Sequence, residues 1–313
     1  MFKIIILKLV VGFQGHLRAQ GGRFAAFTFL AKDLNPKLAQ IPAGPLFCAF
    51  LNQISENGWL DRMKHVEILN VTGFRAKEHL REAPLGILPM GSIEFHGPHA
   101  PLGTDSIIAT ALAERVVKRL GGVLFPLIAY SHCPSTTKGY PGTVSVRTET
   151  MIGYLTEVFR GILATDMKGI LVLNAHDGNI EVVKAVGEVI ADEFPDRFVL
   201  LINWWQTLPE SFVNSLGFFS QSGGHGHGGP LETSVVQAIK PDAVELSKGR
   251  DIDLKPGSAN EVIHVVCGEN RRDAWAGYHG RVSEASKEKG DVLMEESVKR
   301  IVKAVQEWIS SNV

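Results

Sequence analysis

Pro84-Leu-Gly-Ile-Leu-Pro-Met90 is a short apolar run bounded by helix breakers, which is typical of a buried strand. After a turn rich in glycine and proline, Ser106–Leu120 has the apolar spacing of a helix. The same order returns downstream, where the apolar run Lys168–Asn174 precedes the helical pattern of Ile180–Phe194. Such alternation predicts an α/β fold of three layers, α/β/α, with a mostly parallel central sheet in a single domain.

The alternation continues through residues 63–313, which we expect to form that domain. Further strands are expected at Met63–Leu69, Val123–Tyr130 and Phe198–Asn203, and further helices at Thr148–Ala164, Pro230–Ile239 and Ser286–Ile309. Residues 1–62 show no sustained periodicity. We interpret them either as an accessory extension of the domain or as an artefact of a start codon assigned upstream of the true one. Met1–Phe13 has the basic, apolar start of a signal peptide, but Lys8 interrupts its short core and no cleavage site follows.

Four side chains with metal-ligand chemistry follow the first of these strands: Glu94, His96, His99 and Asp105. If the chain stays extended, Glu94 and His96 project from the same face. Asp105 adjoins the helix, and the loop can fold it back toward this pair, where a carboxylate can bridge two metals. Alternatively, Thr104 or Asp105 caps the helix and the other residues are solvated. Four such residues in one turn favour a functional site.

Two further clusters lie downstream. His176 follows the Lys168–Asn174 strand, at the edge where ligands bind in open parallel sheets; the alternative is a histidine with a merely structural hydrogen bond. The glycines around His225 and His227 let backbone and substrate approach closely, although a glycine-rich loop with incidental histidines is the alternative. Glu232 is expected in the first turn of the next helix, where an acid can also serve only to stabilise the helix terminus.

These stretches resemble the creatininase (creatinine amidohydrolase) family in four blocks that occur in the family's order. The blocks are Gly-Ser-x-Glu-x-His-Gly-Pro-His-x-Pro-Leu-Gly-Thr-Asp at 91–105, Tyr-Pro-Gly-Thr-Val at 140–144, Asn-x-His-x-Gly-Asn at 174–179 and His-Gly-Gly-Pro-Leu-Glu-Thr-Ser at 227–234. Ala285-Ser-Lys-Glu-Lys-Gly290 is similar to the family's closing motif. The resemblance runs from about Met63 to the C-terminus, and it implies a layered α/β/α hydrolase that uses two metals and assembles into hexamers.

The resemblance also implies which residues hold the metals. Glu94 and His176 would hold one metal, His96 would hold the other, and Asp105 would bridge them. Carboxylate and imidazole ligands suit zinc, manganese or iron. In one branch of the family an acidic residue two positions after the strand-end histidine completes the second metal's shell. Gly178 stands there in this chain, so Glu232 is the replacement ligand that we favour, with Asp177 a poorer candidate.

The remaining roles concern proton transfer and substrate. His227 matches the histidine to which the family assigns proton transfer, and we expect it to protonate the leaving nitrogen, with Glu232 as a second catalytic residue. His225, Tyr140 and Asp177 are expected to bind substrate. The expected reaction is attack on an amide carbonyl by hydroxide that two divalent metal ions generate and orient.

The substrate expected for this site is a small cyclic amide resembling creatinine. The alternative is a formamide hydrolase (deformylase) acting on a formamidopyrimidine nucleotide of flavin or deazaflavin biosynthesis. Its phosphate contacts could come from Lys138, Arg147, Arg271 and Arg272, although such residues are usually solvated. An alternative from another class, a non-catalytic metal-binding scaffold, would leave His227 and its glycine-rich loop without a purpose.

Composition agrees with a cytoplasmic enzyme. The 313 residues carry a formal net charge of -1 and are 45% hydrophobic, and nothing in this balance suggests nucleic acid or a membrane as a partner. The cysteines, Cys48, Cys133 and Cys267, are scattered and form no disulfide framework, which favours a reducing compartment. Cys133 lies near the 140–144 block and could border the pocket, but the role that we favour for it is a small buried hydrophobe.

Overall fold

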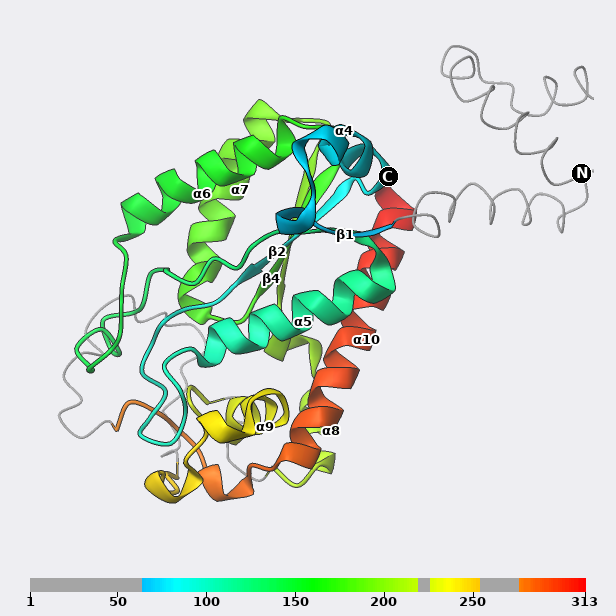
Figure 1. The fold of residues 1–313 in the computed structure, drawn as a ribbon. Coiled ribbons are helices and arrows are strands. Elements are labelled where there is room, and N and C mark those ends of the chain that lie inside the picture. Colours follow the sequence, from blue (N-terminus) through cyan, green and yellow to red (C-terminus); the bar gives the residue numbers. More distant parts are fainter. Residues whose placement is uncertain (1–63, 219–225, 254–275) are drawn as a thin grey trace, which may run out of the picture. The chain divides into compact units, whose positions relative to one another are not determined.

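The computed structural model describes residues 64–218, 226–253 and 276–313, which belong to one compact unit. Within them a sheet of five parallel strands has the order β1-β3-β2-β4-β5 (Figure 1). The strands are β1 His65–Glu67, β2 Leu85–Met90, β3 Gly122–Leu124, β4 Gly169–Asn174 and β5 Phe198–Asn203. The parallel sheet predicted from the alternation of strands and helices is confirmed.

Helices cover both faces of this sheet. Figure 1 shows α5 and α10 on one face and α6 and α7 on the other, and α9 packs against α5 and α10. The helices are α4 Gly73–Glu82, α5 Thr104–Leu120, α6 Thr148–Leu163, α7 Ile180–Glu193, α8 Glu210–Ser215, α9 Pro230–Ile239 and α10 Lys287–Asn312. Short 3-10 helices lie at Ile68–Asn70, Asp177–Asn179, Trp204–Thr207, Pro241–Ala243, Leu246–Lys248 and Val282–Glu284. The three predicted layers are therefore present.

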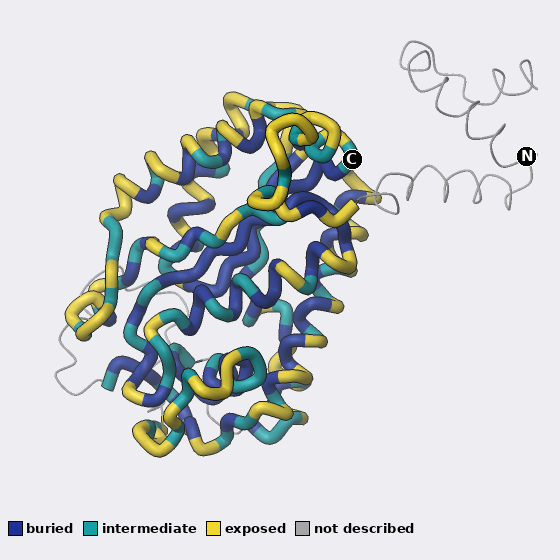
Figure 2. The backbone as a smooth tube through the Cα atoms, in the orientation of Figure 1, coloured by how far each residue is buried: buried dark blue, intermediate teal, exposed yellow. Residues whose placement is uncertain are grey.

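The core lies on both faces of the two central strands, β2 and β4, which are buried along their whole length (Figure 2). Successive side chains of a strand point to opposite faces, so β4 contributes to two apolar clusters. Leu171 and Leu173 pack with α5, α9 and α10, whereas Ile170 and Val172 pack with α6 and α7. Burial on both faces explains why these strands are continuous apolar runs rather than alternating ones.

Two predicted strands are shorter than expected. β3 ends at Leu124. Beyond it, the N–H of Phe125 still donates to the carbonyl of Ile87 over 2.9 Å, and Ile128 forms an isolated bridge with Met90. Pro126 lies in this stretch and has no backbone N–H to donate to the sheet. β1 covers only His65–Glu67 before the chain turns into a 3-10 helix. The predicted domain boundary near Met63 lies outside the described residues and remains a prediction.

The register of the central strands positions the site. Met90 at the end of β2 pairs with Asn174 at the end of β4, so the loops that leave these two strands start side by side. Ligands bind at this carboxyl edge in open parallel sheets. None of the helices in the described ranges combines the length and the apolar character that a membrane span requires.

Candidate metal centre

The loop after β2 turns directly onto the start of α5. Gly91 makes this possible, because a Cβ there would lie 2.5 Å from the backbone nitrogen of Ser106. Ser106 donates its hydroxyl hydrogen to the carbonyl of Ser92 over 2.7 Å, and the Ser92 hydroxyl donates to Oδ2 of Asp105 over 2.6 Å. These contacts fold Asp105 back toward the residues that follow β2.

The loop after β4 is held by buried amides. Asn174 donates through Nδ2 to the carbonyl of His176 over 2.8 Å, and its Oδ1 accepts from the backbone N–H of His176 over 3.1 Å. Asn179 donates to Oδ1 of Asn174 and to the carbonyl of Gly91, each over 3.1 Å. The two asparagines of the Asn-x-His-x-Gly-Asn block thus tie the β4 loop to the β2 loop and fix His176 between them.

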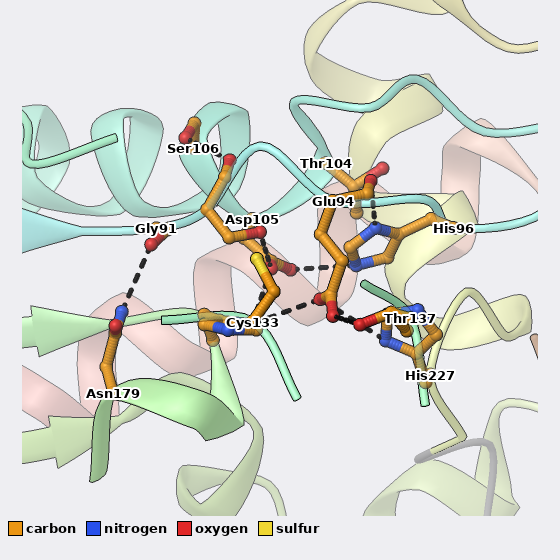
Figure 3. Close-up of polar contacts among 12 residues, drawn as sticks. Gly91, Glu94, His96, Thr104, Asp105, Ser106, Cys133, Thr137, Asn179 and His227 are labelled. Carbon is orange, nitrogen blue, oxygen red and sulfur yellow. Dashed lines mark hydrogen bonds and ion pairs between the residues drawn. The ribbon is translucent and has the colours of Figure 1, made fainter. Parts of the chain in front are cut away.

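Three buried side chains from these loops meet around the carboxylate of Asp105. Its Oδ1 lies 3.0 Å from Nε2 of His96, and its Oδ2 lies 3.0 Å from Nδ1 of His176. Oε2 of Glu94 lies 3.2 Å from the same nitrogen of His176. Figure 3 shows the side chains of Glu94, His96 and Asp105 turned toward one another. One carboxylate therefore faces two different histidines, as a bridging carboxylate between two cations would.

The other nitrogen of each histidine is fixed by a backbone carbonyl. Nδ1 of His96 donates to the carbonyl of Glu94 over 2.9 Å, and Nε2 of His176 donates to the carbonyl of His132 over 2.8 Å. Metal-binding histidines are oriented in the same way, with one ring N–H bonded outward and the other nitrogen turned to the metal. The nitrogens that remain, Nε2 of His96 and Nδ1 of His176, both point at carboxylates.

The residues present fit divalent cations. Oε2 of Glu94 is buried and has no hydrogen bond among the described residues, although Thr137 donates its hydroxyl hydrogen to the other oxygen, Oε1. Three overlapping groups have ligand atoms within 4.8 Å of one another, and they are Glu94 with Cys133 and His176, Glu94 with His96 and His227, and His96 with Asp105 and Glu232. Carboxylates, imidazoles and a thiol are ligands of zinc, manganese and iron.

The electrostatics agree with a site that requires positive charge. Burial lowers the pKa of His96, but the charge and hydrogen bond of Asp105 outweigh this and raise the pKa to about 10. Burial raises the pKa of Asp105, but His96 and His176 together hold it well below its usual range. Burial likewise lowers the pKa of His176, and the hydrogen bond of Asp105 drives it well above the usual value. Protons on these histidines occupy the place that cations would take.

His227 and Glu232 come from the glycine-rich block and the start of α9. Nε2 of His227 donates to the carbonyl of Phe95 over 2.7 Å, while Nδ1 lies 3.8 Å from Oε2 of Glu94. Burial, helped by the charge of His96, lowers the pKa of His227 to about 4. Oε2 of Glu232 accepts from the backbone N–H of Gly228 over 2.7 Å and lies 3.8 Å from Nε2 of His96. Burial raises the pKa of Glu232 to about 7.

The residues expected to bind substrate are more scattered. Tyr140 is half-buried and stacks on Phe95, with ring centroids 4.5 Å apart, beside the carbonyl that holds His227. Asp177 is exposed and belongs to none of the ligand groups found among the described residues. His225 lies outside the described residues, as do Arg271 and Arg272. Of the remaining candidates for phosphate contacts, Lys138 and Arg147 are both exposed.

His99 could bind a metal by its chemistry, but its side chain contacts the segment around Gly228 instead. Its Nε2 lies 3.0 Å from the carbonyl of Gly228 and 3.2 Å from Oγ1 of Thr233, so it holds the segment next to His227. Sequence reasoning missed Thr137, whose hydroxyl binds Glu94, and His132, whose carbonyl orients His176. No sequence signal points to these two, because they come from a segment without regular structure.

The chain is similar to several known proteins. The creatininase family model, described as creatinine amidohydrolase, matches residues 70–305. Creatinine amidohydrolase of Pseudomonas putida is 26% identical over 240 residues, which are 71% of this chain and 88% of that protein. 3-Dehydro-scyllo-inosose hydrolase of Thermotoga maritima is 30% identical over 188 residues, or 60% of this chain and only 56% of that protein.

Solved structures show the same fold. A creatininase described as the manganese form superimposes with a TM-score of 0.67 at 23% identity, covering 79% of this chain and 99% of its own, and a Zn–Zn form has the same score. The family model covers well over half of the chain, and the fold is shared over almost all of the solved protein. The chain therefore belongs to the creatininase family of amidohydrolases.

Proposed function

We propose that this creatininase-family hydrolase opens the C–N amide bond of a small cyclic amide resembling creatinine. The observation that carries the proposal is the carboxylate of Asp105, which places one oxygen 3.0 Å from His96 and the other 3.0 Å from His176. Two divalent cations bound there would activate water and polarise the amide carbonyl. The name of one similar protein, creatinine amidohydrolase, supports an amide substrate, whereas 3-dehydro-scyllo-inosose hydrolase is not named for an amide.

In this proposal each of the two histidines, His96 and His176, binds a different cation. Glu94 and His176 would hold one cation, His96 and Glu232 the other, and Asp105 would bridge them. Each of these atoms is already turned into the cluster, so little reorganisation would accompany loading. In this arrangement Glu232 supplies the acidic ligand that the residue at position 178 cannot.

His227 is the proton carrier in this proposal. It stands against the cluster, its ring centroid 4.1 Å from that of His96, and its Nδ1 faces the carboxylate of Glu94. Its lowered pKa of about 4 makes the resting imidazole neutral, so it would take a proton at Nδ1 before delivering one to the leaving nitrogen. The bond from Nε2 to the carbonyl of Phe95 keeps Nδ1 directed inward.

The nucleotide alternative is less supported by the described residues. Arg147 forms an ion pair with Glu149 at 3.3 Å, and Lys138 is exposed to solvent. Neither side chain lines a buried pocket that could bind a phosphate group. A small neutral amide needs no such site. We therefore expect ring opening of a cyclic amide to be the main activity, ahead of deformylase activity.

His227→Ala tests the catalytic part of the proposal. We expect the variant to retain its bound metal but to lose amide hydrolysis by about 10²–10⁴-fold, because only proton transfer is removed. The measurement is ring opening of creatinine and related cyclic amides, with bound metal determined on the same sample. His65→Ala, at the exposed end of β1, is the matched control. Unchanged hydrolysis in the His227 variant would contradict its role in proton transfer. A wild-type protein that binds metal but hydrolyses no amide would favour the alternative of a non-catalytic metal-binding scaffold.

A further inference from the structure

Cys133 lies at the metal cluster rather than in the apolar core. The residue is completely buried, yet it belongs to neither of the two hydrophobic clusters of the described residues. Its Sγ shares one ligand-sized space with Glu94 and His176, the three ligand atoms lying within 4.8 Å of one another. Figure 3 shows the thiol beside the carboxylates of Glu94 and Asp105. A cysteine that served only as a small hydrophobe would be expected among apolar side chains.

The segment that carries Cys133 is fixed in place. Its backbone N–H donates to the hydroxyl of Ser145 over 3.0 Å, and the nearby Ser131 forms an isolated parallel bridge with the same Ser145. Sγ contacts the carbonyls of Ile93 and Val144 only at 3.9 Å and 3.8 Å, which are long contacts typical of a weak S–H donor. The scaffold therefore holds the sulfur at the cluster, in hydrogen-bonding contact with the side chain of His176.

Gly178 leaves the room that the segment carrying Cys133 occupies beside His176. A Cβ at this position would lie 2.6 Å from Nε2 of His176 and even closer to the carbonyl oxygen of His132. The same carbonyl accepts the hydrogen bond that orients His176. The His132–Cys133 segment thus fills the space of a side chain at 178, and it also presents a thiol on the inner side.

An independent observation points to the same place. Oε2 of Glu94, which is buried and has no hydrogen bond among the described residues, is the atom of that residue turned toward His176. A buried carboxylate oxygen needs a compensating positive charge, which a proton on His176, 3.2 Å away, can supply and a bound cation would supply in its place. A cation there would contact Glu94 and His176, and Cys133 is the next ligand within reach.

We propose that the thiolate of Cys133 is a ligand of the cation held by Glu94 and His176. This inference rests on the proposed metal pair and goes beyond it by naming a sulfur ligand. Binding would release the thiol proton to solvent and form the metal–sulfur bond. Because sulfur is a soft ligand, this half of the site would prefer zinc or iron to manganese.

X-ray absorption at the zinc edge tests the inference on the full chain. We use a Cys48→Ser/Cys267→Ser background, so that Cys133 is the one remaining cysteine. In the zinc-loaded background we expect a sulfur scatterer at about 2.3 Å beside nitrogen and oxygen ligands. Adding Cys133→Ser should remove the sulfur scatterer while the chain stays folded by circular dichroism.

The cobalt-loaded background gives a second readout that needs no further variant. A thiolate ligand should produce a sulfur-to-cobalt charge-transfer band in the near ultraviolet. If about two zinc ions are bound per chain but neither the sulfur scatterer nor this band appears, the Cys133 inference is overturned while the metal pair stands. If the background chain binds no zinc, the proposed function itself fails.

Metal preference provides an independent check. Cys133→Asp replaces sulfur by oxygen, and we expect the ratio of zinc affinity to manganese affinity to fall about tenfold or more. The measurement is competition between the two metals at equilibrium. An unchanged ratio in this variant would contradict the assignment of sulfur to the cation.

Discussion

At the scale of single residues, His96 and Asp105 form a buried ion pair, and in the proposed function a bound metal would replace the proton on His96. In the metal-free protein the pKa of His96 is raised from 6.5 to about 10. A raised histidine pKa adds stability that is fully present below pH 6.5 and is lost as the pH rises through about 10. We therefore expect the urea midpoint of chelated protein to fall across this interval.

His96→Gln is the variant that tests this dependence. Glutamine cannot take up a proton, so the midpoint of the chelated variant should fall less steeply between pH 6.5 and about 10, and His176, whose pKa is also raised, should account for the decline that remains. His65→Gln, at an exposed position, should follow the wild type. An equally steep decline in the His96 variant would show that the pair is not the source of the pH dependence.

Thr137 is a second residue whose removal should be measurable. Its hydroxyl donates to Oε1 of Glu94, and valine at this position keeps the shape but not the donor. Loss of a hydrogen bond to a metal-binding carboxylate typically costs about 10–100-fold in metal affinity. Isothermal titration of zinc into chelated Thr137→Val should show this loss, whereas Thr136→Val serves as the neighbouring control. Equal affinities would mean that Thr137 does not support the metal ligand.

At the scale of elements, the loops after β2 and β4 act as one unit through Asn179. Its buried amide bridges the carbonyl of Gly91 and Oδ1 of Asn174. Asn179→Ala leaves buried polar atoms unpaired, and we expect a loss of about 1–3 kcal/mol in the free energy of unfolding. Asn312→Ala, at the exposed end of α10, should change it little. Urea denaturation of both variants checks the difference.

Gly178 gives a steric prediction for the β4 loop. Alanine there would press against the carbonyl of His132 and Nε2 of His176, so Gly178→Ala should lower both stability and zinc affinity. Gly187 in α7 has open space where a Cβ would lie, and Gly187→Ala should stabilise the protein by about 0.4–1 kcal/mol. Urea denaturation and zinc titration of the two variants measure these effects. A Gly178 variant as stable as the wild type would contradict the close packing of the His132 segment.

Much of this arrangement follows from sequence patterns. The apolar runs of β2 and β4 and the helical spacing of α5 predict their positions closely, because burial on both strand faces and on one helix face leaves a clear periodicity. β3 is shorter than the apolar pattern suggested, since Pro126 interrupts sheet pairing.

The site could be predicted only where a motif follows a regular element. Glu94, His96 and Asp105 cluster because a strand and a helix flank them. Thr137 and Cys133 reach the same place from a long connection between β3 and α6, and no periodicity encodes such a path. His99 shows the converse, because this residue has ligand chemistry but holds a loop.

At the scale of the whole molecule, the status of residues 1–62 and the assembly state remain predictions. We expect a chain that starts at Met63 to fold and to bind as much metal as the full chain, since the described site draws only on later residues. Metal analysis of the two chains tests this.

Mass spectrometry of the native N-terminus separates the two interpretations of the extension, because a product starting at Met1 would contradict an upstream-start artefact. Light scattering should show the hexamer that the family resemblance implies.

The central claim is that two cations at Asp105 drive amide hydrolysis. The most direct test is metal analysis of the purified protein coupled to a hydrolysis screen over creatinine, other small cyclic amides and formamidopyrimidine nucleotides. We predict about two metals per chain, turnover of a cyclic amide, loss of this turnover on chelation and its return with zinc, manganese or iron. A chain that binds no metal, or one whose hydrolysis survives complete chelation, would contradict the account.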